Sequence, residues 1–486
     1  MDPAQPLTEP TPPPPPPSSP LPPSSTPPSP ASPASPAGPA FAMLAVVQAT
    51  LIFTITLIAV PLPRIGQEFD LSAADLVLVN AAYGLPYSGL LLFGGRLADR
   101  YGGRPVFVLG LVLFGLASAT AALAPTFEAL VAVRFSQGVG AALTAPAALA
   151  VLRAVLSDPA VFGRAMATWG GVSVLGAAIG TLASGAVTTW ISWRWMFAVP
   201  VLVAVLALAA TRRLLPAGPA DPSASRPGLD PVGALLATLG ISIGSYGLIL
   251  SGDHPWGSAR VLGPTAVGVA LLALFLLAER RVRDPLLPPG FTVEPRRLVG
   301  LVGILLAAAG TGLVTFLLSL YLQQQQDWST LATTGAFVPF TLALIVVNRL
   351  AGPAVGRYGA GVVTIAGLVG GAVGLALLAG IGPDTSYVTG LLPGAVLLAA
   401  GTSFVFSGST VLTTTNVAAH QAGLAGGVMN TAMELGPTVG LAALMAVAAA
   451  QGDLVVGYAW AFGTGAVVYL AAALAAATVV RRRGSA

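Results

Sequence analysis

Long apolar runs follow one another along this chain of 486 residues, separated by short breaks that contain arginine, proline or glycine. A helix needs about 20 mainly apolar residues to cross a bilayer, whereas a strand of a transmembrane barrel alternates in polarity over about 10 residues. Runs such as VLVAVLALAA (201–210) do not alternate. The sequence therefore predicts an all-α integral membrane protein.

The composition supports this fold class and excludes several kinds of chemistry. Only 8% of the residues are charged, against about a quarter in soluble domains. The chain has no cysteine and two histidines, which excludes disulfides, a cysteine nucleophile, and thiolate or histidine-rich metal sites. All 22 basic residues are arginine, and without lysine no Walker-type G-x-x-x-x-G-K-S/T motif can exist. We expect no enzyme activity, no metal and no cofactor, and no direct use of ATP.

The apolar runs delimit fourteen predicted membrane spans. They comprise residues 42–63, 76–95, 105–124, 129–152, 165–187, 195–211, 232–251, 261–278, 298–320, 332–348, 360–380, 389–412, 422–448 and 455–480.

Arginine placement predicts the orientation, because cytoplasmic loops carry the positive excess. An even number of spans puts both termini on one side. If that side is the cytoplasm, only Arg64, Arg194 and Arg260 lie outside, Arg134 lies within a span, and all the other arginines lie inside. We therefore expect a multi-pass plasma-membrane protein with both termini in the cytoplasm. The net charge of +4 reflects this topology and does not indicate nucleic-acid binding.

The first 41 residues are mostly proline, serine, alanine and threonine. This composition favours a solvated polyproline-like tail over packed structure, and the segment lacks the features of a secretory signal. We expect a disordered cytoplasmic tail, with a docking role for its proline motifs as the alternative.

A charged stretch between the second and third spans, GGRLADRYGGR (94–104), returns between spans ten and eleven as AGPAVGRYGAG (351–361). Adding 257 to the residue numbers carries the RYG triplet of the first copy onto that of the second, and Ser72 onto Ser329. The second copy has glycine where the first has Asp99. A two-half internal repeat, common in transporters, is the natural inference, and chance similarity of glycine-rich loops is the alternative.

Four segments together resemble the major facilitator superfamily. The first is a loop signature, G-x-L-a-D-r-x-G-r-R, carried here by Gly95, Leu97, Ala98, Asp99, Arg100, Gly102 and Arg104. The second, LVAVRFSQGVGAA (130–142), is similar to the family's span 4. The segments SWRWMFAVPV (192–201) and AGLAGGVMNTAMELGPTVGLA (422–442) resemble the fourteen-helix drug:proton antiporter group.

The resemblance implies two six-helix bundles around a central cavity, with two spans inserted between them. The expected divisions are a tail (1–41), an N-terminal bundle (42–212), a linker with two extra spans (213–290) and a C-terminal bundle with a short tail (291–486). It also implies a bacterial exporter of drug-like or antibiotic small molecules, which confers multidrug efflux and antibiotic resistance by proton antiport. The expected partners are that small-molecule substrate, protons and the lipid bilayer.

The loop signature is expected to act as a conformational latch. A carboxylate at a helix end can accept strong hydrogen bonds from a helix N-terminus or an arginine, so Asp99 could hold one bundle against the other. Gly95, Arg100, Gly102 and Arg104 complete this set. The alternative is a solvated loop whose arginines follow the positive-inside bias.

Arg134 and Glu434 are the charges expected well inside spans, where an ionisable group is a functional candidate by default. Arg134 matches the family's span 4 arginine, which the resemblance implicates in proton transfer. Glu434 stands where the family requires no acid, and its burial would suit a group that binds and releases a proton. The alternatives are snorkelling to the interface for Arg134 and structural pairing for Glu434.

Two departures from the antiporter pattern weaken the case for proton coupling. In span 1, Thr54 occupies the usual aspartate position and Ala59 the usual asparagine position. In span 5, Thr181 and Ser184 replace a usual proline and glycine. An uncoupled facilitator or importer of a small metabolite therefore stays open, as does a non-transporting membrane scaffold.

A cavity for an amphipathic substrate would be lined by apolar and aromatic groups with a few polar ones. Residues with these properties at suitable positions are Asn80, Tyr83, Tyr87, Trp169, Phe404 and Asn430. Each of the aromatic residues could equally serve helix packing or contact lipid.

Overall fold

The computed structural model describes residues 37–156, 190–216, 228–288, 294–415 and 422–481, together with positions 290, 291 and 417 and scattered positions between 158 and 188. Its elements are α1 (Ala37–Thr56), α2 (Leu62–Phe69), α3 (Ala73–Tyr101), α4 (Gly103–Ala122), α5 (Phe127–Val155), η1 (Trp193–Phe197), α7 (Ala198–Leu214), α8 (Pro231–Ile249), η2 (Leu250–Gly252), α9 (Ala259–Glu279), α10 (Pro295–Leu320), η3 (Tyr321–Gln325), α11 (Thr330–Tyr358), α12 (Ala360–Leu378), η4 (Tyr387–Leu391), α13 (Leu392–Thr414), α14 (Ala422–Leu435), η6 (Gly436–Gly440), α15 (Leu441–Ala449) and α16 (Leu454–Arg481).

Thirteen helical segments within the described residues are long and apolar enough to cross a membrane. They correspond to the predicted spans except the fifth, 165–187, most of which lies outside the described residues. α3, α5 and α11 have 29 residues each. At 1.5 Å per residue such a helix is about 43 Å long, so its ends project beyond the hydrocarbon core of about 30 Å.

Two predicted span edges differ from the structure. The first span was expected to run to residue 63, but α1 ends at Thr56 and a separate short helix, α2, begins at Leu62. Pro61 precedes α2 and has no N–H to continue the helical ladder. The tenth span was expected to end at 348, but α11 continues to Tyr358 and carries Arg349 on its exposed face.

The predicted two-half repeat is visible in the capping of the helices. α3 and α11 have the same length and lie 257 positions apart, since both 330 minus 73 and 358 minus 101 give that number. Ser72 and Ser329 cap their N-termini by accepting from the backbone N–H three residues on. Gly102 and Gly359 end them with φ of 93° and 83°, a backbone conformation that favours glycine.

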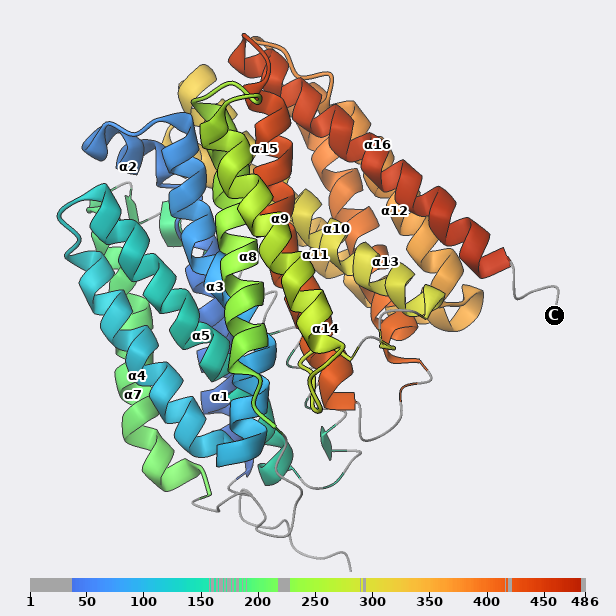
Figure 1. Ribbon diagram of the computed structural model, residues 1–486. Helices are drawn as coiled ribbons and strands as arrows, with labels where there is room; N and C mark the ends of the chain where they lie inside the picture. The colour runs from blue at the N-terminus through green and yellow to red at the C-terminus, as the bar shows by residue number, and fades with distance from the viewer. Residues whose placement is uncertain are drawn as a thin grey trace, which may run out of the picture.

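The helices form two groups with a pair between them (Figure 1). α1, α3, α4, α5 and α7 pack with one another, as do α10, α11, α12, α13 and α16. α8 and α9 pack together along their length, and α8 also contacts α3 on one side and α15 on the other. The inserted pair therefore touches an element from each half of the chain.

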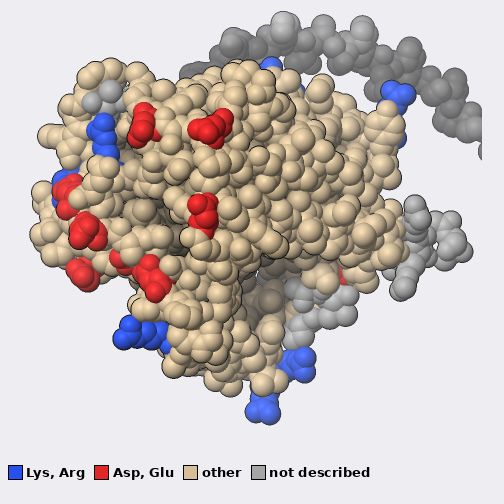
Figure 2. All heavy atoms as spheres, turned by 90° about the horizontal axis from the view of Figure 1, so that it is seen from above, with Lys and Arg blue, Asp and Glu red and all other residues tan. Residues whose placement is uncertain are grey.

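The two ends of the bundle differ in charge. Described arginines gather at the end formed by the C-termini of α3, α5, α7, α9 and α11, which we call the arginine-rich end. Figure 2 looks onto the opposite end, where acidic side chains gather. The acids in the helix ends and turns there are Glu68, Asp70, Asp75, Glu128, Asp253, Asp327, Asp384 and Asp453.

Candidate functional site

Arg134 lies on α5 with none of its surface exposed. Its Nη1 donates to the carbonyl oxygen of Thr54 on α1 at 3.1 Å and to Oε1 of Gln137 at 3.2 Å. Its Nε and Nη2 are buried and have no hydrogen-bond partner within the described part of the chain. The snorkelling alternative is wrong, because the guanidinium points into the protein. It keeps two donors for water, a proton relay or a ligand.

A short series of hydrogen bonds fixes the side chain of Gln137, which contacts Arg134. Gln137 Nε2 donates to Ser118 Oγ on α4 at 2.7 Å, and that hydroxyl donates to the carbonyl of Phe114 at 2.6 Å. The amide of Gln137 is thereby held with its oxygen toward Arg134. This series of hydrogen bonds ends at the backbone of α4, so it orients the arginine and does not lead to solvent.

The Thr54 side chain does not substitute for the aspartate usual at its position. Its hydroxyl donates to the carbonyl of Thr50 on its own helix at 2.7 Å. Only its backbone carbonyl meets Arg134. Arg134 forms no ion pair with a described residue, so its charge has neutral acceptors only.

Tyr83 on α3 interacts with both Arg134 and Glu434. The guanidinium carbon of Arg134 is 5.2 Å from the centre of the Tyr83 ring, a cation–π distance. The Tyr83 hydroxyl donates to the carbonyl of Leu51 at 3.2 Å, and its ring centre is 5.6 Å from that of Tyr87. Glu434 is close enough to act electrostatically on both tyrosines.

Glu434 lies in the last turn of α14 and is only 3% exposed. No described side chain donates a hydrogen bond to its carboxylate. The helix widens to a π-helix directly after it, where Pro437 supplies no N–H to a regular ladder. Here α3 and η6 approach closely, because a Cβ atom at Gly84 would collide with the side chain of Thr438. Arg134, Tyr83, Tyr87 and Glu434 thus form a buried centre, built from both halves of the chain.

The other cavity candidates are spread over several helices. Asn80 and Asn430 are half-buried on α3 and α14. Trp169 is buried against Phe41, with ring centres 6.5 Å apart. Phe404 is half-buried on α13, and its Cβ lies close to Gly367 of α12.

The loop signature makes its hydrogen bond to the inserted segment through Arg96. Arg96 donates to the carbonyl of Pro285 at 2.6 Å. Asp99 is exposed and interacts electrostatically with Arg96 and with Arg153 at the end of α5. Both partners belong to the same half of the chain, so the latch role of Asp99 stays a prediction.

The remaining members of the signature shape the turn between α3 and α4. Gly102 supplies the positive φ described above, and Gly95 is half-buried near Pro146 of α5. Arg100 lies over the ring of Tyr101 at 5.9 Å. Arg104 faces Arg212 across a surface cavity of about 490 Å³ between α4 and α7.

The two halves meet at the acidic end through backbone carbonyls that follow α1. Ser319 Oγ donates to the carbonyl of Ala59 at 3.1 Å, and Gln323 Nε2 donates to that of Val60 at 3.0 Å. These two bonds join α10 and η3 to the turn after α1 at the acidic end.

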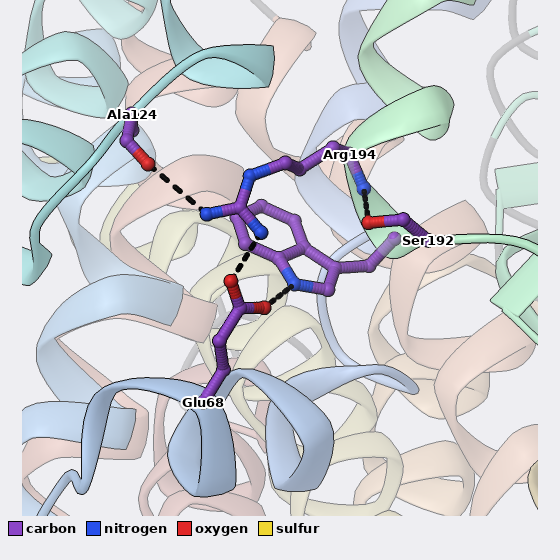
Figure 3. A network of polar contacts seen from close by, with 5 residues as sticks. Glu68, Ala124, Ser192 and Arg194 are labelled. Atoms are coloured by element: carbon purple, nitrogen blue, oxygen red, sulfur yellow. Dashed lines mark hydrogen bonds and ion pairs between the residues drawn. The ribbon is translucent and has the colours of Figure 1, made fainter.

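A second network holds α2 against η1, the short helix before α7 (Figure 3). Glu68 accepts from the indole N–H of Trp193 at 2.7 Å and from Arg194, whose Nη2 also donates to the carbonyl of Ala124 at 3.1 Å. Partial burial opposes ionisation of Glu68, but the bonds from Trp193 and Arg194 and the charge of Arg194 outweigh it. They hold the pKa of Glu68 below its ordinary value.

Comparison with known proteins is consistent with this arrangement. The Major Facilitator Superfamily matches residues 42–441 and, in a second match, 301–486. The puromycin resistance protein pur8 of Streptomyces alboniger is 37% identical over 395 residues, covering 81% of this chain and 78% of that protein. The cephamycin export protein CmcT of Amycolatopsis lactamdurans is 36% identical over 398 residues, covering 82% of each.

A solved structure shares the fold at low sequence identity. The POT family transporter PepTSo superposes with a TM-score of 0.63 and 16% identity, covering 92% of this chain and 98% of that one. The family match over most of the chain and the shared fold lead to the same conclusion. The chain belongs to the major facilitator superfamily, and it is a multi-pass helical transporter of that family.

Proposed function

We propose that this protein exports antibiotic-like small molecules across the bacterial plasma membrane in exchange for protons, with the arginine-rich end in the cytoplasm. The observation that carries the proposal is the buried centre, where Arg134 and Glu434 both act electrostatically on Tyr83. The names of two relatives, a puromycin resistance protein and a cephamycin export protein, suggest the substrate class.

Each group of the centre has a distinct part in the exchange. Glu434 has no hydrogen-bond donor among the described side chains, so its carboxylate can take up either a proton or a cationic group of a substrate. Arg134 keeps a fixed positive charge against the ring of Tyr83. A proton on Glu434 and a positively charged substrate then compete for one carboxylate, which is the requirement for exchange.

The test uses proteoliposomes and follows proton movement when puromycin is added. The wild type should move protons on addition of puromycin, and Glu434→Gln should abolish this movement and weaken the binding of puromycin. Glu128→Gln, the same chemical change on an exposed glutamate of α5 at the acidic end, is the matched control and should behave like wild type. Proton movement that persists in Glu434→Gln would overturn the role of Glu434.

An uncoupled facilitator is the second candidate, and one observation favours it. The hydroxyl of Thr54 donates to the carbonyl of Thr50 on its own helix. Span 1 therefore offers Arg134 neither this hydroxyl nor an ionisable group. Substrate flux without any proton movement in the wild type would establish this alternative. A scaffold role would instead survive loss of the centre and fail on deletion of residues 1–36, whereas transport should survive that deletion.

A further inference from the structure

Two carboxyl groups are buried together at the arginine-rich end of the inserted helix pair, far along the chain from Glu434. Asp230 is the N-cap of α8 and Glu279 is the last residue of α9. They are 4% and 2% exposed. Neither residue belongs to the transport centre described above.

One oxygen of each carboxyl group has an ordinary partner. Asp230 Oδ1 accepts from the N–H of Gly233, and Glu279 Oε2 accepts from that of Leu287, both at 2.8 Å. The second oxygens, Asp230 Oδ2 and Glu279 Oε1, are buried without a donor among the described groups. Both would touch one Cβ atom added at Gly233, so the two oxygens lie within about 5 Å of each other, and Asp230 acts electrostatically on Glu279.

A hydrogen bond can join two neighbouring carboxyl groups only when one of them carries a proton. Two carboxylates held this close and away from water cannot both stay ionised. The charged groups that surround the pair are Arg96 on α3, which acts on Glu279 but donates to Pro285, and the exposed Asp284. The arginines that follow α9, at 280, 281 and 283, are also exposed.

The segment that Glu279 holds, residues 280–288, links the inserted pair to both halves of the chain; we call it the bridge loop. Arg96 fixes it through Pro285, and Asp284 Oδ2 accepts from the N–H of Gly228 at 3.2 Å. Leu287 of the loop, with Phe291 beyond it, packs into an apolar cluster. The members of that cluster from other elements include Leu92 of α3, Leu301 and Ile304 of α10, and Ala425 and Val428 of α14.

We propose that Asp230 and Glu279 form a second proton-binding site, which keeps the bridge loop docked across the arginine-rich end while it holds one proton. Loss of that proton leaves two negative charges in contact. Their repulsion separates the end of α9 from the start of α8 and weakens the bond from Leu287, so the loop leaves the apolar cluster. The site thus senses the pH at this end of the protein and controls access there.

The absence of cysteine makes a direct test possible. A single cysteine placed by Ala425→Cys, at a position 1% exposed within the cluster, reports whether the loop covers it. The full chain in lipid nanodiscs is labelled with a polar maleimide from about pH 6 to about pH 8.5. Arg213→Cys, at an exposed position on α7, is labelled in parallel to correct for the pH dependence of the thiol itself.

We expect the corrected labelling rate of Ala425→Cys to rise several-fold with pH. Adding Asp230→Asn to Ala425→Cys should keep the labelling rate low at every pH. The asparagine amide can donate to Glu279 even when Glu279 is ionised, and asparagine remains a good N-cap. Glu279→Gln should act in the same way. Asp284→Asn is the matched control for a changed acid in the same segment and should preserve the pH response.

Three results would overturn the proposal: a labelling rate that does not change with pH, an unchanged pH response in Asp230→Asn, or an equal loss of response in Asp284→Asn. The measurement needs neither substrate nor a proton gradient. Its failure is therefore separate from any failure of the proton-exchange proposal, for which Glu434→Gln is the test.

Discussion

Two arginines from the first half of the chain differ in burial and in their ionic partners. Arg194 lies at the acidic end with its side chain 27% exposed, paired with Glu68, bonded to Ala124 and 4.5 Å from the ring centre of Trp193. Arg134 is fully buried, meets no carboxylate, and leaves Nε and Nη2 without a partner in the described structure.

The difference separates a structural charge from a functional one. A surface ion pair adds little stability, about 0–1 kcal/mol, and costs little to keep. A buried charge without an ionic partner costs several kcal/mol. The structural contacts of Arg194 account for its position, whereas the burial of Arg134 lowers the free energy of unfolding. The comparison therefore predicts that the two arginines respond in opposite ways to removal.

The largest effect is expected for Arg134→Met, which keeps an unbranched side chain and removes the charge. Substrate-driven proton movement should fall to background, while the free energy of unfolding should rise by about 1–4 kcal/mol, the gain seen when buried ions are replaced by apolar groups. Proteoliposome transport and thermal unfolding in detergent measure the two effects. Arg194→Met is the matched variant and should keep transport while losing a little stability. A destabilised Arg134→Met would show that this arginine is structural.

The next effect concerns the close contact that sets the distance between α3 and Glu434. Gly84→Ala places a methyl group against Thr438, and overpacking of this kind costs about 1–3 kcal/mol. The melting temperature should fall, and adding Thr438→Ser should restore much of it, because serine lacks the opposing methyl group but can still bond the carbonyl of Glu434.

A double-mutant cycle measures this coupling between the two positions. Gly257→Ala, where an added Cβ atom meets nothing within 4 Å, is the control and should be neutral. Additive effects of Gly84→Ala and Thr438→Ser would contradict the proposed contact.

The capping and repeat features were predictable because they are local. Ser72 and Ser329, and Gly102 and Gly359, stand at fixed offsets in the sequence, and their roles depend on a few neighbouring residues. The buried position of Arg134 followed from the cost of a charge inside a span. Each of these conclusions required only one helix and its ends.

The candidate site was predictable only where residues share a helix. Tyr83 and Tyr87 are one turn apart, so their contact follows from helical spacing. Ser118 was missed, because its role depends on how α4 is rotated against α5. Asp230 and Glu279 were also missed: they stand at the first and last positions of a helical hairpin, about 50 residues apart in sequence, and only the packing of α8 on α9 brings them together. An aspartate directly before a proline at a helix start was the one local signal.

The smallest effect is expected at the exposed pair of the opening comparison, and it should depend on pH. The pKa of Glu68 is lower in the folded protein than its ordinary value of 4.5. Its contribution to stability is therefore present above about pH 4.5 and is lost as the pH falls through the lower, folded value. Glu68→Gln should lower the free energy of unfolding by no more than about 1 kcal/mol at neutral pH, and the difference from wild type should vanish in acid. Thermal unfolding at a series of pH values measures this difference. A gap between the two proteins that grows in acid would mean that Glu68 is held for another reason, and the contrast between its partner Arg194 and the buried Arg134 would lose its basis.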